Sequence, residues 1–425
     1  MTVQASQSTS VSENEIPLSE RDHPKRYVVL LVVVLGILTA VGPLSTDMYL
    51  PAFPAIADGL GTTEAYIQLT LTASMVGLAV GQALIGPLSD RFGRRGPLLI
   101  GMTVFTLATV ACAFAPTAGA LIAARAVQGL AGAAGMVVSR AVIRDHFTGD
   151  AMTSFISKMM FITMLAPMLG PIIGGQIILV APWPVIFLVL GAVSLVATLL
   201  IAKFLPESLP AAQRREIHLR SLMSDVGVLV RTPQFIFPVM TVCFTFATMF
   251  VYISSFSFIS QEEFGASETV YSIIFAIGTV AVLLGNQVNI FLMKKVKIPS
   301  TRRMIIGASL ATVGVLALFG LWATGTATLV SMTAVIVVMM FGNGIVFPNT
   351  GALAMSSQPP NTAGTASALM GSLQMAAGGA LPALVMFGQV NLQHMATGML
   401  ILFVGALVMI TLTVRAYREP QALAA

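Results

Sequence analysis

Long apolar stretches separated by short polar segments follow one another along nearly the whole chain. About 20 apolar residues are enough for a helix to cross a lipid bilayer. Twelve such stretches are predicted to span, at residues 27–53, 65–88, 97–115, 118–143, 152–180, 184–204, 234–259, 268–293, 302–323, 327–355, 362–388 and 393–416. Lipid offers the backbone no hydrogen-bond partners, so each span is expected to be helical. The pattern predicts an all-α polytopic membrane protein with 12 transmembrane helices.

Positive charge gathers in every second connection between these stretches. Starting from the N-terminus, alternate connections carry Lys or Arg, for example Arg91 and Arg94 after the second stretch and Lys294 and Lys297 after the eighth. The other connections contain no Lys or Arg and hold Asp58, Glu64, Glu262, Glu263 and Glu268. Because basic loops stay on the cytoplasmic side, both termini are predicted to be cytoplasmic.

The longest polar connection divides the chain into two halves. The predicted parts are a disordered cytoplasmic tail, a six-helix bundle, a cytoplasmic linker, a second six-helix bundle and a short cytoplasmic tail, at residues 1–26, 27–204, 205–233, 234–418 and 419–425. Two halves of this kind are typical of one transporter architecture, in which the binding site lies between the halves near the membrane midplane.

Composition excludes several classes of function. Hydrophobic residues make up 56% of the chain and charged residues only 9%, whereas soluble domains carry about 25% charged residues. The net charge of +5 does not indicate nucleic-acid binding, because the basic residues lie beside the spans. The two cysteines, Cys112 and Cys243, lie inside apolar stretches and offer no metal-site spacing. Motifs for ATP hydrolysis or proteolysis are absent from the sequence, so an enzyme is not expected.

Asp47 is the only acid well inside an apolar stretch. A carboxylate at membrane depth costs a few kcal/mol unless it is paired or hydrated, and such residues usually mark an ion or substrate path. Arg125 lies about as far from the outer end of its stretch as Asp47 does, so a rise of about 1.5 Å per residue places both at a similar depth. We expect the two to interact directly or through a polar network. A static ion pair that only locks two helices is the alternative.

The connection after the second stretch, residues 86–95, reads GPLSDRFGRR. Gly86 is expected to permit a close helix contact and Gly93 a tight turn. Asp90 is placed to accept hydrogen bonds from a nearby helix start, and Arg94 and Arg95 to pair with Asp145 at the end of the fourth stretch. The alternative is a basic cytoplasmic loop whose charges have no particular partners.

Four segments resemble motifs of the major facilitator superfamily. Residues 86–95 resemble its loop signature, G-x-L-a-D-r-x-G-r-R/K, and residues 121–129 resemble the helix-four motif of its drug:proton antiporters, which carries an intramembrane arginine. Residues 170–175 (GPIIGG) resemble the helix-five antiporter motif G-P-x-x-G-G. Residues 47–51 (DMYLP) resemble the helix-one motif of the twelve-helix drug antiporters, especially the Bcr/CflA subfamily. The resemblance covers the whole chain, although the second copy of the loop signature is degenerate at residues 294–297.

The segment 170–175, called the antiporter motif below, has a physical meaning of its own. Gly170 and Gly174 are four residues apart, as are Pro171 and Gly175, and small residues at that spacing let helices touch closely while prolines bend them. The resemblance implies that the eighth helix is the neighbour and that the seam stops ions from leaking. Ordinary helix packing is an alternative that does not exclude this role.

The resemblance implies a proton-coupled antiporter that exports small, largely apolar drugs across a bacterial inner membrane by alternating access. The drugs are either of the phenicol type or of several chemical classes. The resemblance also implies proton coupling through Asp47 and Arg125, and a cytoplasmic lock formed by Gly86, Asp90, Gly93, Arg94 and Asp145. The expected partners are a small-molecule drug or metabolite and the bilayer, with the proton as coupling ion, no cofactor or metal, no nucleic acid, and a monomeric state. Export of an endogenous metabolite, a non-transporting sensor and a substrate:proton symporter are the alternatives.

Residues that contact the substrate are the least determined part of the sequence. Tyr49, Gln128, Met159 and Thr163 are predicted to do so, because they lie near the coupling pair or on a helix expected to line the cavity. The seventh stretch is rich in aromatic residues, which suit apolar ligands. Most of those rings are expected to pack in the core or against lipid.

Overall fold

The computed structural model describes residues 25–147, 149–214, 219–359, 362–386, 388 and 390–422, and all regular secondary structure within these residues is helical. The long helices are α1 (Lys25–Asp47), α3 (Glu64–Phe92), α4 (Arg95–Ala113), α5 (Ala118–His146), α6 (Gly149–Val180), α7 (Pro184–Phe204), α9 (Pro233–Phe258), α10 (Glu268–Lys294), α11 (Ser300–Ala323), α12 (Leu329–Ser356), α13 (Ala363–Met386) and α14 (Leu392–Ala422). Shorter elements are η2 (Leu50–Ala52), α2 (Phe53–Leu60), η3 (Ala211–Gln213), α8 (Leu219–Arg231) and η4 (Ile259–Glu263).

Within the described residues, 11 helical segments are long and apolar enough to cross a membrane. The twelfth long helix is α6, which contains the apolar segment Leu165–Val180. The prediction of an all-α polytopic membrane protein is therefore confirmed.

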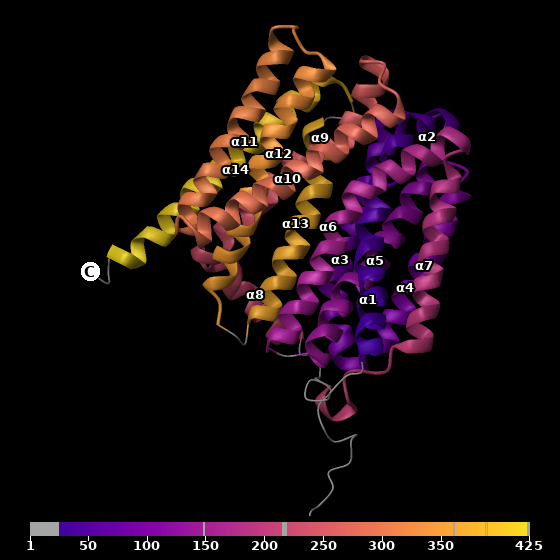
Figure 1. Cartoon of the computed structure of the whole chain (residues 1–425), viewed down its shortest axis with the longest axis vertical. Coiled ribbons are helices and arrows are strands. Elements are labelled where there is room, and N and C mark those ends of the chain that lie inside the picture. Colours follow the sequence, from indigo (N-terminus) through magenta and orange to yellow (C-terminus); the bar gives the residue numbers. More distant parts are fainter. Residues whose placement is uncertain are drawn as a thin grey trace, which may run out of the picture.

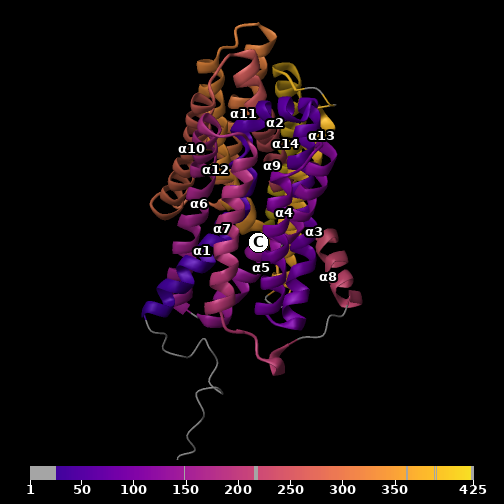
Figure 2. The same cartoon turned by 90° about the vertical axis from the view of Figure 1, so that its right-hand side faces the viewer.

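The long helices form two groups that follow the order of the chain (Figure 1). In the first group α3 packs on α5, α4 packs on α5 and α7, and α1 packs on α6. In the second group α11 packs on α12, α14 packs on α9, and α10 packs on α12. The groups meet where α13 lies along α3 and where α10 crosses α6. Figure 2 shows the same bundle from the side, with α8 beside the lower part of the helices. The exact domain limits stay a prediction.

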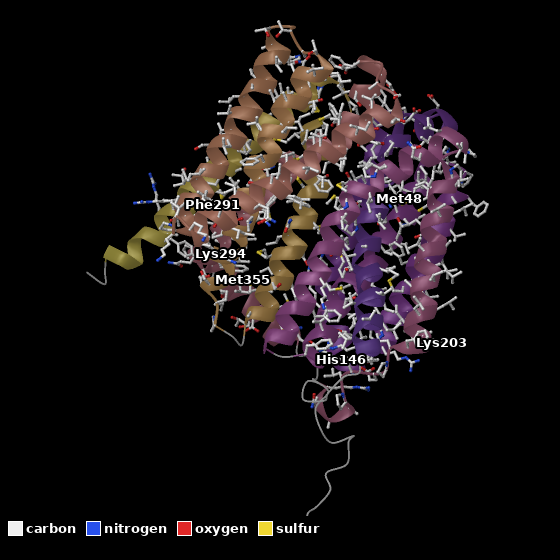
Figure 3. The ribbon with its side chains drawn as sticks, viewed as in Figure 1. Met48, His146, Lys203, Phe291, Lys294 and Met355 are labelled. Carbon is white, nitrogen blue, oxygen red and sulfur yellow. The ribbon has the colours of Figure 1, made fainter. Side chains whose placement is uncertain are left out.

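The two groups are joined at one end of the bundle, called the closed end, which lies at the top of Figures 1 and 3, on the side of the turn that holds Met48. There the Ser257 hydroxyl donates to the Leu50 carbonyl oxygen at 2.5 Å, and the Gln261 side-chain amide donates to the Pro51 carbonyl oxygen at 3.2 Å. At the opposite end, where Figure 3 labels His146 and Lys203, α6 and α10 have separated (Figure 1). In the described part of the chain, the hydrogen bonds between the halves all lie toward the closed end, and the opposite end is called the open end below.

The first predicted span is not one helix. α1 ends at Asp47, and the chain turns through Met48 and Tyr49 before η2 and α2 continue it. Pro51 is the second residue of η2 and has no N–H to donate, and a proline disfavours helical geometry in the residue before it. The predicted span corresponds to Tyr27–Leu60, but its helix is interrupted after Asp47, and the break places Asp47 at a helix end.

The segment between the halves and the ends of the chain carry more helix than the sequence indicated. α8 lies within the predicted linker, and its Leu229 is buried against Phe235 of α9. α14 continues to Ala422, beyond the predicted end at 416, because a helix that leaves the bilayer no longer requires apolar side chains. The predicted tails lie outside the described residues at 1–24 and 423–425.

Candidate functional site

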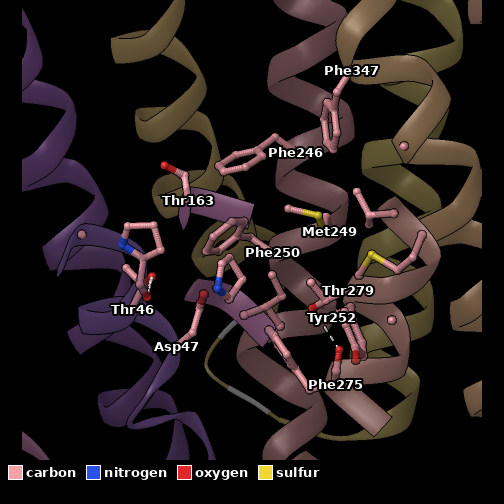
Figure 4. A pocket seen from close by; sticks show the side chains of 18 of the residues that line it. Thr46, Asp47, Thr163, Phe246, Met249, Phe250, Tyr252, Phe275, Thr279 and Phe347 are labelled. Carbon is pink, nitrogen blue, oxygen red and sulfur yellow. Dashed lines mark hydrogen bonds between the residues drawn. The ribbon is translucent and has the colours of Figure 1, made fainter. Parts of the chain in front are cut away.

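A cavity of about 580 Å³ lies between the two groups of helices, with walls from α1, α3, α5 and α6 on one side and α9, α10, α12 and α13 on the other. Small-molecule sites typically have volumes of about 300–1,000 Å³. Its wall is dominated by rings and thioethers, namely Phe246, Phe250, Tyr252, Phe275, Phe347, Met75, Met136, Met249, Met340 and Met375 (Figure 4). Asp47 is the only charged side chain among the described residues of this wall.

Asp47 occupies the last position of α1 and is 6% exposed. Figure 4 shows its side chain at the edge of the cavity, below Thr163 and beside Thr46. α6 covers it closely, since a methyl group added at Gly170 would lie 3.2 Å from the Cβ of Asp47. No Lys, Arg or His of the described chain lies within ion-pair distance of its carboxylate. The cavity therefore contains a carboxyl group without a fixed cation.

Arg125 is fully buried in α5. Its Nη1 donates to the Ser45 carbonyl oxygen at 2.9 Å and to Oε1 of Gln128, whose Nε2 donates to the Thr109 hydroxyl at 2.7 Å. The guanidinium lies 4.3 Å from the centre of the Tyr49 ring, a favourable cation–π geometry. Its Nε and Nη2 have no hydrogen-bond partner in the described part of the chain. A buried guanidinium with two free donors is costly to maintain.

Asp47 and Arg125 share no hydrogen bond or ion pair among the described residues, and their interaction stays a prediction. Arg125 of α5 contacts the last turn of α1, which also carries Asp47, so the two residues lie at a similar depth as predicted. Ser45 and Tyr49, four residues apart, contact Arg125, whereas Asp47 lies between them in sequence and lines the cavity. The arginine thus holds the backbone that carries Asp47 and leaves its carboxylate without a cation.

The antiporter motif packs against two helices. A methyl group at Gly174 would lie 1.7 Å from the Met48 carbonyl oxygen, so α6 touches the turn after α1 backbone to backbone. On the other face a methyl group at Gly175 would lie 2.5 Å from the Ser272 hydroxyl, which donates to the Pro171 carbonyl oxygen at 2.8 Å. The contact with the eighth span, α10, is present as expected. The equally tight contact with α1 was not predicted.

The loop signature forms a charged cluster at the open end. Arg94 pairs with Asp90 at 2.5 Å and with Asp145 of α5 at 3.1 Å. The backbone N–H of Arg94 donates to Glu207 at 2.7 Å, and Gly93 adopts a φ of +90° that favours glycine. These residues all belong to the first half and to the start of the segment that follows α7. Their role as a conformational lock stays a prediction.

Three details of this loop differ from expectation. The N–H groups at the start of α4, those of Arg94 and Arg95, donate to Glu207, whereas Asp90 accepts from the Arg94 side chain. Arg95 does not pair with Asp145 but donates to the Ala202 carbonyl oxygen at 2.7 Å. Gly86 makes no close contact, since a methyl group there would lie 3.9 Å from Val137. The backbone contact between α3 and α5 occurs one and a half turns earlier, where a methyl group at Gly81 would lie 2.3 Å from the Leu130 carbonyl oxygen. The sequence did not distinguish the packed glycine from the unpacked one.

Of the four predicted substrate contacts, only Thr163 lies in the described cavity wall. Tyr49 and Gln128 are held by Arg125 and face away from the cavity. Met159 is buried in the core of the first half with residues of α1, α4, α5 and α7. These three residues lie outside the described cavity wall, so their role as substrate contacts stays a prediction that the cavity does not support.

The residues that the sequence missed come mainly from the second half. Phe246, Phe250 and Tyr252 of α9 line the cavity, while Phe235 and Phe256 of the same helix are buried elsewhere. Their signal was the aromatic density of the seventh stretch. Because the rings occur on all faces of the helix, their spacing alone does not indicate which ones face a ligand.

A family model described as "Major Facilitator Superfamily" matches residues 35–382. The chain is 38% identical over 84% of its length to "Uncharacterized MFS-type transporter YdgK" of Bacillus subtilis, and it covers 88% of that protein. It is 29% identical over 84% of its length to "Bicyclomycin resistance protein homolog" of Haemophilus influenzae, covering 88% of it, and 30% identical over 72% to "Chloramphenicol resistance protein" of Pseudomonas aeruginosa, covering 72% of it.

Solved structures share the fold at low sequence identity. An inward-facing, unoccupied bacterial homologue of the human lysosomal transporter Spinster matches with a TM-score of 0.73 and 13% identity over 93% of this chain and 98% of that one. A D-xylose-proton symporter matches with a TM-score of 0.69 and 18% identity over 91% and 97% of the two chains.

Proposed function

The chain belongs to the major facilitator superfamily of membrane transporters, and from this premise we propose that it is a proton-coupled antiporter. Its substrates are small, largely apolar drugs, which it exports across the bacterial inner membrane by alternating access. The observation that carries the proposal is an apolar cavity between two helical halves whose wall, over its described residues, holds one charged side chain, Asp47. The bicyclomycin and chloramphenicol resistance proteins among the relatives agree with it.

The cavity wall supports an apolar and variable cargo. Aromatic rings such as Phe246 and Phe250 offer flat surfaces for stacking, and methionines such as Met249 and Met340 adapt their shape to different ligands. The uncharged polar groups of the described wall that can orient a ligand are those of Thr46, Thr163, Tyr252, Thr279 and Asn286. We expect a wall of this kind to bind ligands with apolar surfaces and to discriminate only weakly between their chemical structures.

Asp47 supports proton coupling. A charged carboxylate in an apolar cavity is costly unless water or a cation stabilises it. A drug that displaces water from the cavity, or that carries positive charge, therefore changes the balance between the neutral and charged forms of Asp47. Arg125 holds the backbone around Asp47 without neutralising it, so the proton remains exchangeable.

Alternating access requires that one end be sealed while the other is open. The seal at the closed end includes the antiporter motif, where Gly174 meets the Met48 carbonyl oxygen and Gly175 meets Ser272. The positive-inside pattern assigns the opposite end, with both termini, to the cytoplasm. The structure then corresponds to a state that receives drug from the cytoplasm.

The driving force is sufficient for export. One proton that enters down 100 mV and one pH unit supplies about 3.7 kcal/mol. That free energy sustains a gradient of a neutral drug of roughly 500-fold. If one proton is exchanged for one monovalent cationic drug, no net charge crosses the membrane and the membrane potential contributes nothing. The pH difference alone then sustains a drug gradient of about tenfold.

The proposal is tested with a drug-susceptibility panel in an efflux-deficient bacterium that expresses the wild type, Asp47→Asn or Asp58→Asn. Asp58 is an exposed acid of α2, so its amide variant is a matched control outside the cavity. We expect the wild type and Asp58→Asn to protect against phenicols and other apolar drugs, and Asp47→Asn to give no protection at equal membrane expression. Protection by Asp47→Asn would contradict proton coupling through this residue. If cells that express the wild type were as susceptible to every drug as cells without the protein, drug export would be contradicted. That result would favour export of an endogenous metabolite.

A further inference from the structure

The second half of the chain contains no Asp or Glu after Glu268, although several cations follow that residue. Residues 269–418 include no Asp or Glu, although they include Lys294, Lys295, Lys297, Arg302, Arg303, Arg415 and Arg418. In the first half, by contrast, Arg94 is paired with Asp90 and Asp145. No ion pair is found for the cations of residues 294–303 among the described residues, so a ligand from outside the chain can supply their counter-charge.

Five of these cations gather where α10 ends and α11 begins. Figure 3 shows Phe291 and Lys294 of α10 on the flank of the molecule that faces away from the first half. Arg303 turns inward and is 5% exposed, with its Nε donating to Oδ1 of Asn349 at 3.0 Å. Asn349 in turn donates to Oδ1 of Asn289 at 2.7 Å. This buried chain joins α10, α11 and α12, so the turn outside it rests on a fixed frame.

A pocket of about 420 Å³ lies on the outer side of this frame. It is lined by Val296, Lys297, Ile298, Pro299, Arg302, Ile305 and Ile306. Two cations thus face a space whose other described walls are apolar, and no acid of this segment competes for them. Arg302 lies in the first turn of α11, and Ile305 and Ile306 follow it along the same helix.

Lys297 has a backbone conformation that a lysine rarely adopts. Its φ is +57°, the only positive φ of a non-glycine residue among the described residues. Glycine occupies this left-handed region without steric cost, whereas a side chain makes it unfavourable. A lysine at such a position places an amine at the pocket at the expense of backbone strain, which is the kind of outlier that points to a function.

The outward face of α11 continues the pocket as an apolar strip. Ile305, Ile306, Val313 and Leu316 are 39%, 38%, 60% and 52% exposed, which is expected of side chains that face lipid. A molecule with an anionic head and a long apolar tail therefore matches the whole surface, from the cations at the helix start to the strip beyond them. Basic pockets between transmembrane helices are known to suit anionic lipid headgroups.

We propose that the pocket at the α10–α11 turn binds an anionic phospholipid, whose phosphate contacts Lys297 and Arg302 and whose acyl chain lies along Ile305 and Ile306. The proposal is independent of what the central cavity transports. It assigns a lipid partner to the cations at the α10–α11 turn, which have no Asp or Glu close to them in sequence.

The test compares two double variants that remove equal charge from the same turn. Lys297→Gly with Arg302→Gln alters the pocket, and Lys294→Gln with Lys295→Gln alters two exposed lysines outside its lining. Binding of phosphatidylglycerol to purified, delipidated protein is measured by native mass spectrometry and by lipid-dependent thermal stabilisation. Phosphatidylcholine and inorganic phosphate serve as the neutral-lipid and free-anion probes.

Each cation near an anionic headgroup contributes roughly a fivefold gain in affinity, so the pocket variant is expected to bind phosphatidylglycerol about 30-fold more weakly. The Lys294/Lys295 variant should bind within about threefold of the wild type, and neither phosphatidylcholine nor inorganic phosphate should replace phosphatidylglycerol. Lys297→Gly alone relieves backbone strain, so it should fold at least as well as the wild type and still lose about fivefold in affinity. Equal losses in both double variants, or equal binding of phosphatidylcholine, would overturn the proposal.

Discussion

Replacing Gly174 by alanine tests the seam between α6 and the end of α1. The added methyl group would lie 1.7 Å from the Met48 carbonyl oxygen, whereas ordinary van der Waals contact begins at 3.4 Å. A backbone carbonyl cannot rotate away as a side chain can, so the two segments have to separate. The same substitution at Gly170, where the nearest atom is 3.2 Å away, requires a shift of only a few tenths of an ångström.

Overpacking of this kind costs about 1–3 kcal/mol, against a gain of about 1 kcal/mol in helix propensity from glycine to alanine. We therefore expect Gly174→Ala to destabilise the protein by roughly 2 kcal/mol and Gly170→Ala to be close to neutral. Gly320→Ala is the matched control, because nothing lies within 4 Å of its added methyl group in α11. Its free energy of unfolding should rise by up to about 1 kcal/mol.

The assay is thermal unfolding of the three purified variants in one detergent, followed by proton leak in proteoliposomes without drug. Gly174→Ala should unfold at the lowest temperature, and its vesicles should lose a pH gradient fastest, because the opened seam admits water and ions. If Gly174→Ala were as stable and as tight as Gly320→Ala, the seam would not depend on backbone contact and the reasoning would be refuted.

Three further substitutions probe the charged groups. Arg94→Gln removes the ion pairs with Asp90 and Asp145 and should lower the free energy of unfolding by about 1–3 kcal/mol in thermal melts, discounted for the half-exposed Asp90. Arg95→Gln loses only a hydrogen bond to the Ala202 carbonyl oxygen and should change the free energy of unfolding by less than about 1 kcal/mol. Equal destabilisation by Arg94→Gln and Arg95→Gln would show that the ion pairs of Arg94 do not stabilise the fold. Arg125→Lys keeps the charge but cannot hold Ser45, Gln128 and the Tyr49 ring together, so drug efflux from vesicles should fall at least about tenfold at equal expression. Wild-type efflux by Arg125→Lys would show that its geometry is dispensable.

The sequence predicted the helical framework well because that framework depends on composition and charge. Apolar stretches of sufficient length are forced to be helical in lipid, whatever their neighbours. The break after Asp47 was missed because Pro51 and Pro54 stand at the end of an apolar run, where apolarity alone indicates continuation. The prolines interrupt the helix there although the side chains remain apolar.

The site was only partly predictable for a different reason. Asp47 and Arg125 were found because ionisable groups at membrane depth are rare, and rarity is visible in a sequence. The cavity wall depends on which face of each helix meets the other half, and α9 carries aromatic residues on every face. Met159 shows the consequence, since a residue on the expected helix turned out to be buried in the core of the first half.

The central claim is that Asp47 exchanges a proton when drug enters the cavity. The most direct measurement is proton release from the purified protein in weakly buffered detergent solution upon addition of a neutral apolar drug, compared between the wild type and Asp47→Asn, with drug binding measured in parallel. The account predicts that the wild type changes its proton content on binding and that Asp47→Asn binds the drug with no proton change. A wild type that binds drug without any proton change, or an Asp47→Asn variant that matches the wild-type change, would contradict it.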